Sequence, residues 1–272
     1  MYGPRPGEWR GRFARLLLVL IALVASAGPI QAQTPAGRSG VSIDLNIPAL
    51  RIDVFESGRR VKSYPVAVGQ PGHATPVGSF TISRAEWNPW WRPPPGREWT
   101  RGREVTPPGP NNPMGRVKMF FAPLYFIHGT PEEGSLGTPA SHGCVRMRNE
   151  DAIELATLLH ERASPSVHAR EIERILASQR TTRNVAFRDS VALTIRYRPV
   201  VVEGDELVAY PDIYRRRAIH TEAVMQALLE AGYEVSGLEP ADVRTFVERA
   251  RSSREPVRMS LDRIGSASPR TR

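Results

Sequence analysis

Apolar and polar residues alternate over much of the first half of the chain, with the period of two that is typical of half-buried β-strands. The runs are short, rich in β-branched residues and separated by turn residues such as Ser57 and Gly58. This pattern indicates a mostly β domain. The predicted strands cover residues 41–47, 50–55, 61–68, 78–83, 117–121 and 124–128.

The apolar spacing changes to that of amphipathic helices after residue 148, and strands and helices then follow one another. The predicted organisation is a mostly β domain with some α-helix over residues 41–215, a helical addition over 216–250 and a basic, disordered tail over 251–272. The predicted helices cover residues 149–159, 166–178, 219–231 and 241–250, and the predicted strands 191–197 and 200–210, the last one bent at Gly204 and Asp205.

Residues 85–116 interrupt the strand pattern. They contain Trp87, Trp90, Trp91 and Trp99, and eight prolines lie between positions 89 and 113. Because proline removes a backbone donor and breaks both helices and strands, we expect a long, ordered loop without regular secondary structure.

The first 27 residues are organised like a secretory signal peptide. Four arginines precede an apolar run at 16–25, and residues 25–27 supply the small side chains of a cleavage site. A membrane anchor needs about 20 apolar residues, so this run is too short. We expect a cleaved signal at 1–27, a linker at 28–40 and export to the periplasm, with a retained anchor as the alternative.

The formal net charge of +9 does not indicate a nucleic-acid-binding protein. Residues 1–27 contribute +3 and residues 251–272 contribute +4, which leaves +2 for the body of the chain. The charge lies mainly at the ends, so nucleic acid is not an expected partner. Only Lys62 and Lys118 of the 37 basic residues are lysines, and the single cysteine excludes an internal disulfide framework.

A lone cysteine in an exported protein is a buried apolar residue, an intermolecular disulfide partner or a nucleophile. Cys144 follows Gly143 rather than lying in an apolar run, which favours the nucleophile. A thiol nucleophile needs a base and oxyanion donors. His128, at the end of a predicted strand, is a better base than His142, and the amides of Gly143 and Cys144 are candidate donors. A zinc site of His128, His142 and Cys144 is the alternative, although no fourth ligand has a characteristic spacing.

The spacing of these residues resembles the signature of the L,D-transpeptidase catalytic domain family, of the YkuD type. The similarity rests on His-Gly-Thr at 128–130, Ser-His-Gly-Cys-Val-Arg-Met at 141–147 and Asn-Glu-Asp at 149–151. Upstream, residues 72–82 contain a Thr-Pro-x-Gly segment, and the stretches within 88–94 and 107–115 resemble the periplasmic branch of the family. The resemblance covers roughly residues 41–160.

This resemblance implies a β-sandwich-like catalytic domain and a thiol enzyme that acts on peptidoglycan stem peptides, without a cofactor or a metal ion. It also implies that Arg146 pairs with a stem-peptide carboxylate. The matching positions are Cys144 as nucleophile, His128 as general base, Gly129 as the carbonyl that orients the imidazole, His142 and Gly143 at the oxyanion site, and Ser141 and Arg146 in substrate binding.

The implied reaction begins with attack of the thiolate on the amide before the terminal D-alanine, which leaves as a thioester forms. An amine of a second stem then yields a 3–3 crosslink, or a lysine of an outer-membrane lipoprotein yields a wall-anchored protein. Water in place of the amine would make the enzyme an L,D-carboxypeptidase. A non-catalytic wall-binding module and a zinc hydrolase are the alternatives from other classes.

The tryptophan-rich loop precedes the strand that delivers His128, so we expect it to wall one side of the cleft above Cys144. Its indole rings, Trp91 among them, are then expected to line the channel for the donor stem. A purely structural clasp between loops is the alternative.

Overall fold

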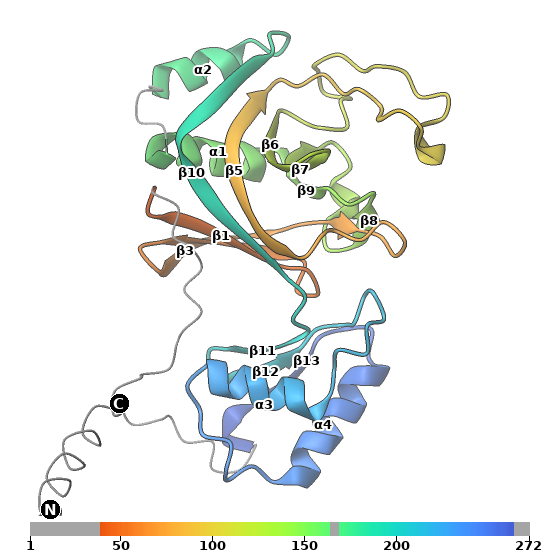
Figure 1. The fold of residues 1–272 in the computed structure, drawn as a ribbon, viewed down its shortest axis with the longest axis vertical. Coiled ribbons are helices and arrows are strands. Elements are labelled where there is room, and N and C mark those ends of the chain that lie inside the picture. The colour runs from red at the N-terminus through yellow and green to blue at the C-terminus, as the bar shows by residue number, and fades with distance from the viewer. Residues whose placement is uncertain (1–38, 164–168, 264–272) are drawn as a thin grey trace, which may run out of the picture. The chain divides into compact units, whose positions relative to one another are not determined.

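A computed structural model describes residues 39–163 and 169–263 of the chain (Figure 1). The expected signal peptide and nearly all of the expected linker lie outside the described residues. Within the described ranges, no helix is both long enough and apolar enough to cross a membrane.

Eight strands form one continuous mixed sheet in the order β3-β2-β1-β10-β5-β6-β7-β9. The β1–β10 and β7–β9 pairs are parallel and the other neighbours are antiparallel. The expected mostly β fold with helices is therefore confirmed. The strands are β1 (Val41–Asn46), β2 (Arg51–Glu56), β3 (Arg59–Pro65), β5 (Gly78–Trp87), β6 (Val117–Ala122), β7 (Tyr125–Thr130), β9 (Val145–Arg148) and β10 (Arg183–Arg196).

Two long, curved strands, β5 and β10, join the two halves of this sheet (Figure 1). Helix α1 (Asn149–Ala163) packs against β6, β7, β9 and β10 and buries one apolar stripe in the main core. A second helix, α2 (Ala169–Ala177), contacts α1. A small parallel pair, β4 (Val68–Gly69) and β8 (Pro139–Ser141), lies outside the large sheet.

The C-terminal part has its own apolar core, which begins at Val200 and not at the expected boundary after residue 215. The expected bent strand at 200–210 is a hairpin, because Gly204 adopts a positive φ and reverses the chain. The expected disorder of 251–272 is wrong for residues 257–263: β13 pairs with β12, and Leu261 is buried. The elements of this C-terminal part are β11 (Val200–Glu203), β12 (Glu206–Ala209), α3 (Thr221–Glu230), α4 (Pro240–Ser252), β13 (Val257–Ser260) and a 3-10 turn (Leu261–Arg263). Residues 264–272 lie outside the described part of the chain.

The proline-rich loop starts three residues later than expected, because β5 continues to Trp87. Trp87 is fully buried in the main core, and its Nε1 donates a hydrogen bond to His160 Nε2 at 2.9 Å. Residues 88–116 then form the expected loop, apart from one 3-10 turn (Glu98–Thr100). The buried Asn112 amide donates to three loop carbonyls, those of Pro89, Thr106 and Pro107, which gives the loop a defined shape.

The Trp87–His160 contact predicts a pH dependence of stability. Burial lowers the pKa of His160 to about 4, so the unfolded chain binds a proton more tightly than the folded chain between about pH 6.5 and 4. With respect to this group, the free energy of unfolding is therefore highest above pH 6.5. It falls by about 2 kcal/mol between pH 7 and 5. His160→Gln keeps an acceptor for Trp87 but does not titrate. Urea unfolding of the two proteins at pH 7 and 5 should show a smaller loss for His160→Gln, and equal losses would contradict the assignment.

Candidate active site

A row of polar residues crosses the sheet at the centre of the candidate site. The strand register pairs Glu86 with Lys118, Lys118 with His128, and His128 with Arg146, so neighbouring members lie on adjacent strands of β5, β6, β7 and β9. Asn184 of β10 continues the row beyond Glu86. Because directly paired residues project from the same face of a sheet, all five side chains share one surface.

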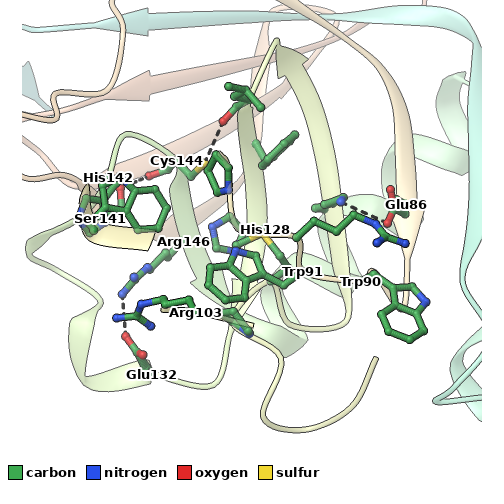
Figure 2. Close-up of a pocket in the computed structure, with 18 of the residues that line it drawn as sticks. Glu86, Trp90, Trp91, Arg103, His128, Glu132, Ser141, His142, Cys144 and Arg146 are labelled. Atoms are coloured by element: carbon green, nitrogen blue, oxygen red, sulfur yellow. Dashed lines mark hydrogen bonds and ion pairs between the residues drawn. The ribbon is translucent and has the colours of Figure 1, made fainter. Parts of the chain in front are cut away.

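This row lines a pocket with a volume of about 650 Å³ (Figure 2). The cysteine motif lines another part of the pocket through Ser141, His142 and Cys144. Loop 88–116 contributes Trp90, Trp91 and Trp99 to the lining. Trp87, the last residue of β5, does not line the pocket. The loop therefore borders the space that holds the thiol, and the expectation that Trp87 also lines it is wrong because that indole is in the core.

His128 is almost completely buried, and its Nδ1 lies 2.7 Å from the Gly129 carbonyl oxygen. A carbonyl only accepts, so Nδ1 carries the proton and Nε2 presents a lone pair. No other partner of the ring is present among the described residues. This is the contact that the family resemblance implied for Gly129.

Asn149 supports this contact, and sequence reasoning did not identify it as a site residue. Its side chain accepts from Arg116 N at 3.1 Å and donates to the Thr130 carbonyl at 3.2 Å. A Cβ at Gly129 would lie only 2.3 Å from Asn149 Oδ1. The close approach of this amide therefore requires glycine directly after the histidine.

Cys144 reaches the pocket, but the surrounding protein desolvates its sulfur. The Sγ lies 3.6 Å from the Leu124 carbonyl oxygen, and the Phe126 amide also bonds to it. Burial raises the pKa of the Cys144 thiol to about 11 and lowers the pKa of His128 to about 4. Desolvation of the sulfur outweighs the Phe126 amide and the nearby cations Arg146 and Lys118, so the thiol and the imidazole are both neutral near pH 7. No hydrogen bond joins the two groups in the described part of the chain.

The motif turn uses one of the two amides that the sequence suggested for an oxyanion. The Gly143 amide donates to Ser141 Oγ at 3.0 Å, and Ser141 Oγ donates to the Cys144 carbonyl at 2.5 Å. The expected pair of free donors is therefore wrong for Gly143, because the Ser141 hydroxyl is a nearer acceptor. The Cys144 amide has no such partner in the described part of the chain.

Buried hydrogen bonds also support the turn that carries Gly143. Thr75, fully buried, donates to the Gly143 carbonyl at 3.1 Å and accepts from the Gly69 amide at 2.8 Å. Gly143 has a φ of +111°, and a Cβ there would meet the Tyr125 ring at 2.8 Å. Glycine is therefore required at this position by backbone conformation and by space.

Tyr214 links this support to the segment after β12. Its hydroxyl donates to the Gly69 carbonyl at 2.7 Å and accepts from the Thr75 amide at 3.2 Å. Its ring stacks on Tyr197, with the ring centres 5.3 Å apart. Nothing in its local sequence signals this role, because the contact spans about 140 residues.

His142 does not face the thiol as a second base. Its ring stacks on Trp99 with centres 4.1 Å apart and lies 4.8 Å from the ring of His73. Burial and the neighbouring His73 lower the pKa of His142. Trp99, one of the loop tryptophans expected to line the cleft, lines the pocket and joins the loop to the cysteine motif.

Arg146 lines the pocket and forms an ion pair with Glu132, with Nη1 and Oε2 2.9 Å apart. The Glu132 side chain is 65% exposed and the Arg146 side chain 18% exposed. The guanidinium therefore holds a carboxylate at the pocket edge, and that carboxylate reaches solvent.

Within residues 39–163 and 169–263, no three side chains of His, Cys, Asp or Glu are grouped as metal ligands. His128, His142 and Cys144 do not converge, because the His142 ring turns to Trp99. The zinc alternative has no ligand set in this part of the molecule.

Comparison with known proteins identifies the domain. Residues 40–172 match the family model described as YkuD, the L,D-transpeptidase catalytic domain. The chain is 34% identical over 122 residues to the probable L,D-transpeptidase ErfK/SrfK of Escherichia coli K12, a match that covers 42% of this chain and 39% of the relative. It is 37% identical over 117 residues to the probable L,D-transpeptidase YbiS of the same organism, covering 40% and 38% of the two chains.

The matched stretch thus spans about two fifths of the length of these curated relatives. Among solved structures, an L,D-transpeptidase from Mycobacterium smegmatis aligns with a TM-score of 0.38 at 15% identity, over 58% of each chain. The family match contains strands β1 to β9, helix α1 and every residue proposed above as nucleophile, base or oxyanion-site residue. Residues 40–172 of this chain match the YkuD family of L,D-transpeptidase catalytic domains, and the curated relatives that align with this chain are named as probable L,D-transpeptidases.

Proposed function

We propose that the protein is a cysteine-dependent acyltransferase that crosslinks peptidoglycan stem peptides through a thioester on Cys144. The observation that carries the proposal is the orientation of the His128 ring in the pocket that the chain's single thiol also lines. Its Nδ1 is fixed by Gly129, so its basic nitrogen is the one left for the pocket that Cys144 also lines. A nucleophile and an oriented base in one pocket are the minimum for acyl transfer.

In the first half-reaction, Cys144 Sγ attacks the carbonyl carbon that precedes the terminal D-alanine, and His128 Nε2 takes the thiol proton. Since the pKa of the thiol is far above that of the imidazole, the proton moves as the carbon–sulfur bond forms and not before. The Cys144 amide, which the motif turn leaves without a partner among the described residues, is the proposed donor to the oxyanion. His128 then returns the proton to the leaving D-alanine amine, which leaves a thioester.

Arg146 is proposed to bind a donor carboxylate. Its ion pair with the exposed Glu132 supports this proposal, because a substrate carboxylate could take the place of the Glu132 carboxylate. Exchange of Glu132 for the substrate conserves the charge pairing, and Glu132 returns to water. The Ser141 hydroxyl is engaged within the turn, so its proposed contribution to substrate binding is to position the Cys144 loop.

In the second half-reaction, an amine attacks the thioester and yields a crosslink between stems or to a lipoprotein lysine. Peptidoglycan lies outside the inner membrane, so the expected export signal at 1–27 agrees with this substrate. The test is mass spectrometry of the mature protein incubated with a disaccharide-tetrapeptide. Loss of D-alanine, a mass adduct on Cys144 and a dimeric product are expected. Hydrolysed tripeptide without dimer would instead identify an L,D-carboxypeptidase.

Substitution of the two reacting side chains should separate their roles. Cys144→Ser should abolish D-alanine release, because a hydroxyl is a much weaker nucleophile with only a histidine to assist it. His128→Ala should reduce the rate about 10²- to 10⁴-fold, the usual loss for a general base. His142→Ala serves as the comparison and should cost far less. A larger loss for His142→Ala would mean that the base has been misassigned.

The pKa of the thiol gives a second prediction. With a pKa raised to about 11, Cys144 is almost entirely protonated at pH 7. Alkylation of the substrate-free enzyme by iodoacetamide should therefore accelerate about tenfold per pH unit from pH 7 to about 10. The rate is followed by mass spectrometry, with free cysteine as control. A plateau between pH 6 and 8 would indicate a preformed thiolate–imidazolium pair and contradict the neutral resting state.

The loop is proposed to bind the donor stem through Trp91. The Trp91 backbone pairs with Thr106 in both directions at 2.9 Å, so removal of the indole leaves the main-chain contact in place. Trp91→Ala should raise the KM for the tetrapeptide about 3- to 10-fold and leave the iodoacetamide rate of Cys144 nearly unchanged. Parallel losses in both assays would favour the structural clasp.

A further inference from the structure

Lys118 is a cation beside the base that the proposed mechanism does not use. It is the direct cross-strand partner of His128 and one of only two lysines in a chain with 37 basic residues. Its Nζ lies 3.2 Å from Glu86 Oε1, and each of these side chains is only 13% exposed. Burial lowers the pKa of Lys118, whereas Glu86 opposes that shift.

Two cation–glutamate pairs therefore flank His128 in the row. Arg146 with Glu132 lies on the β9 side, and Lys118 with Glu86 lies on the β6 side. Adjacent strands are about 4.8 Å apart, so both cations lie one strand from the base, in opposite directions. The proposed reaction has two substrates, and only the first has been given a charged partner.

The surroundings of Lys118 restrict where its charge can act. Its Nζ lies 5.2 Å from the centre of the Phe120 ring and 5.3 Å from that of Phe126, and Glu86 is the carboxylate paired with it. The nearby cations Arg84 and Arg92 oppose its charge. Apart from Arg146 on β9, the other cations that line the pocket are Arg92 and Arg103, which come from the loop and not from a strand next to β7. Lys118 is therefore the cation that the sheet fixes on this side of His128.

We propose that Lys118 binds the acyl acceptor, by holding the carboxylate of an α-amino carboxylate so that its amine is directed to His128. This inference rests on the proposed acyl transfer. A molecule with a carboxylate and an amine on one carbon can place the carboxylate at Lys118 and the amine at His128, because these two residues lie on neighbouring strands. An amine without a nearby carboxylate would leave Lys118 paired with Glu86 alone. The acceptor class is thus a free amino acid or the amino-acid centre at the end of a diamino acid side chain.

The chemical step balances without a further reactant. The acceptor amine attacks the thioester carbonyl carbon, and a carbon–nitrogen bond forms as the carbon–sulfur bond breaks. The proton of the amine passes to His128 Nε2 and from there to Cys144 Sγ, which restores the neutral thiol. Lys118 keeps its proton throughout and contributes only charge and position.

The experiment compares two acceptors that differ only in the carboxylate, D-methionine and D-methioninamide, with the tetrapeptide as donor. Transfer product and D-alanine are both quantified by mass spectrometry. The wild type should prefer the acid by about 10- to 100-fold in kcat/KM for the acceptor, the range for one bond to a charged group. Lys118→Met should reduce this preference to about 1, and Lys118→Arg should retain most of it.

Lys62→Met is the matched control. Lys62 is the other lysine, also on a strand and paired with a glutamate, Glu154, at 2.6 Å, but it does not line the pocket. The Lys62→Met variant should leave the preference for the acid over the amide unchanged. If Lys118→Met keeps the preference, or loses transfer to acid and amide equally, Lys118 is structural and the inference is overturned.

A binding measurement separates this inference from the proposed function. In protein labelled with ¹⁵N-lysine, only two side-chain ammonium signals are expected, and Lys62→Met assigns them. D-Methionine, but not its amide, should shift the Lys118 signal. If the wild type releases no D-alanine, the proposed function fails, and this titration still decides the role of Lys118. An unchanged Lys118 signal at saturating acid would overturn it.

Discussion

The register of β5, β6, β7 and β9 is the constraint on which the site depends. Along β6, Val117 and Met119 face the core, and Lys118 between them faces the pocket. If β6 slipped by one residue, these two faces would exchange. Lys118 would then be buried in the core and would no longer lie next to His128. Since each exchange would place a charge in the apolar core, the packing that stabilises the fold also fixes the order of the polar row.

The reacting groups are held by tight packing more than by polar contacts between them. Asn149 leaves no space for a side chain at Gly129, and Tyr125 leaves none at Gly143. Thr75 and Tyr214 extend this support to a segment far along the chain. Burial of the Cys144 sulfur among these elements raises its pKa, which keeps the thiol protonated near pH 7.

The sequence predicted the strands and the cysteine motif well, because both depend on local patterns. A period of two marks a half-buried strand, and the motif is contiguous. Errors arose where distant residues decide the outcome. The prolines that begin at Pro89 hid the continuation of β5 to Trp87, which is buried in the core and bonds to His160, 73 residues away. Arginines around residues 257–260 suggested disorder, but β12 supplies a partner strand.

The site shows the same division. His128, Cys144 and Gly129 were identified from the motif, and the contact between His128 and Gly129 is local. The motif did not reveal that the Gly143 amide donates to Ser141 Oγ and not to an oxyanion, since this depends on the side-chain conformation of Ser141. Lys118 became meaningful only through its register opposite His128, which no single strand reveals.

The position of β10 determines when the molecule can fold. This strand is synthesised last among the eight, yet it lies in the middle of the sheet, where β1 pairs with it on one side and β5 on the other. It also falls after residue 172, where the family match ends. Until residue 196 is available, no strand pairing within the large sheet joins β1–β3 to β5, β6, β7 and β9, and among the described residues only the segment after β3 bonds to β8 and β9. Their union is a late, long-range event of high contact order, and a shortened chain that ends with the family match would present two open sheet edges to other chains.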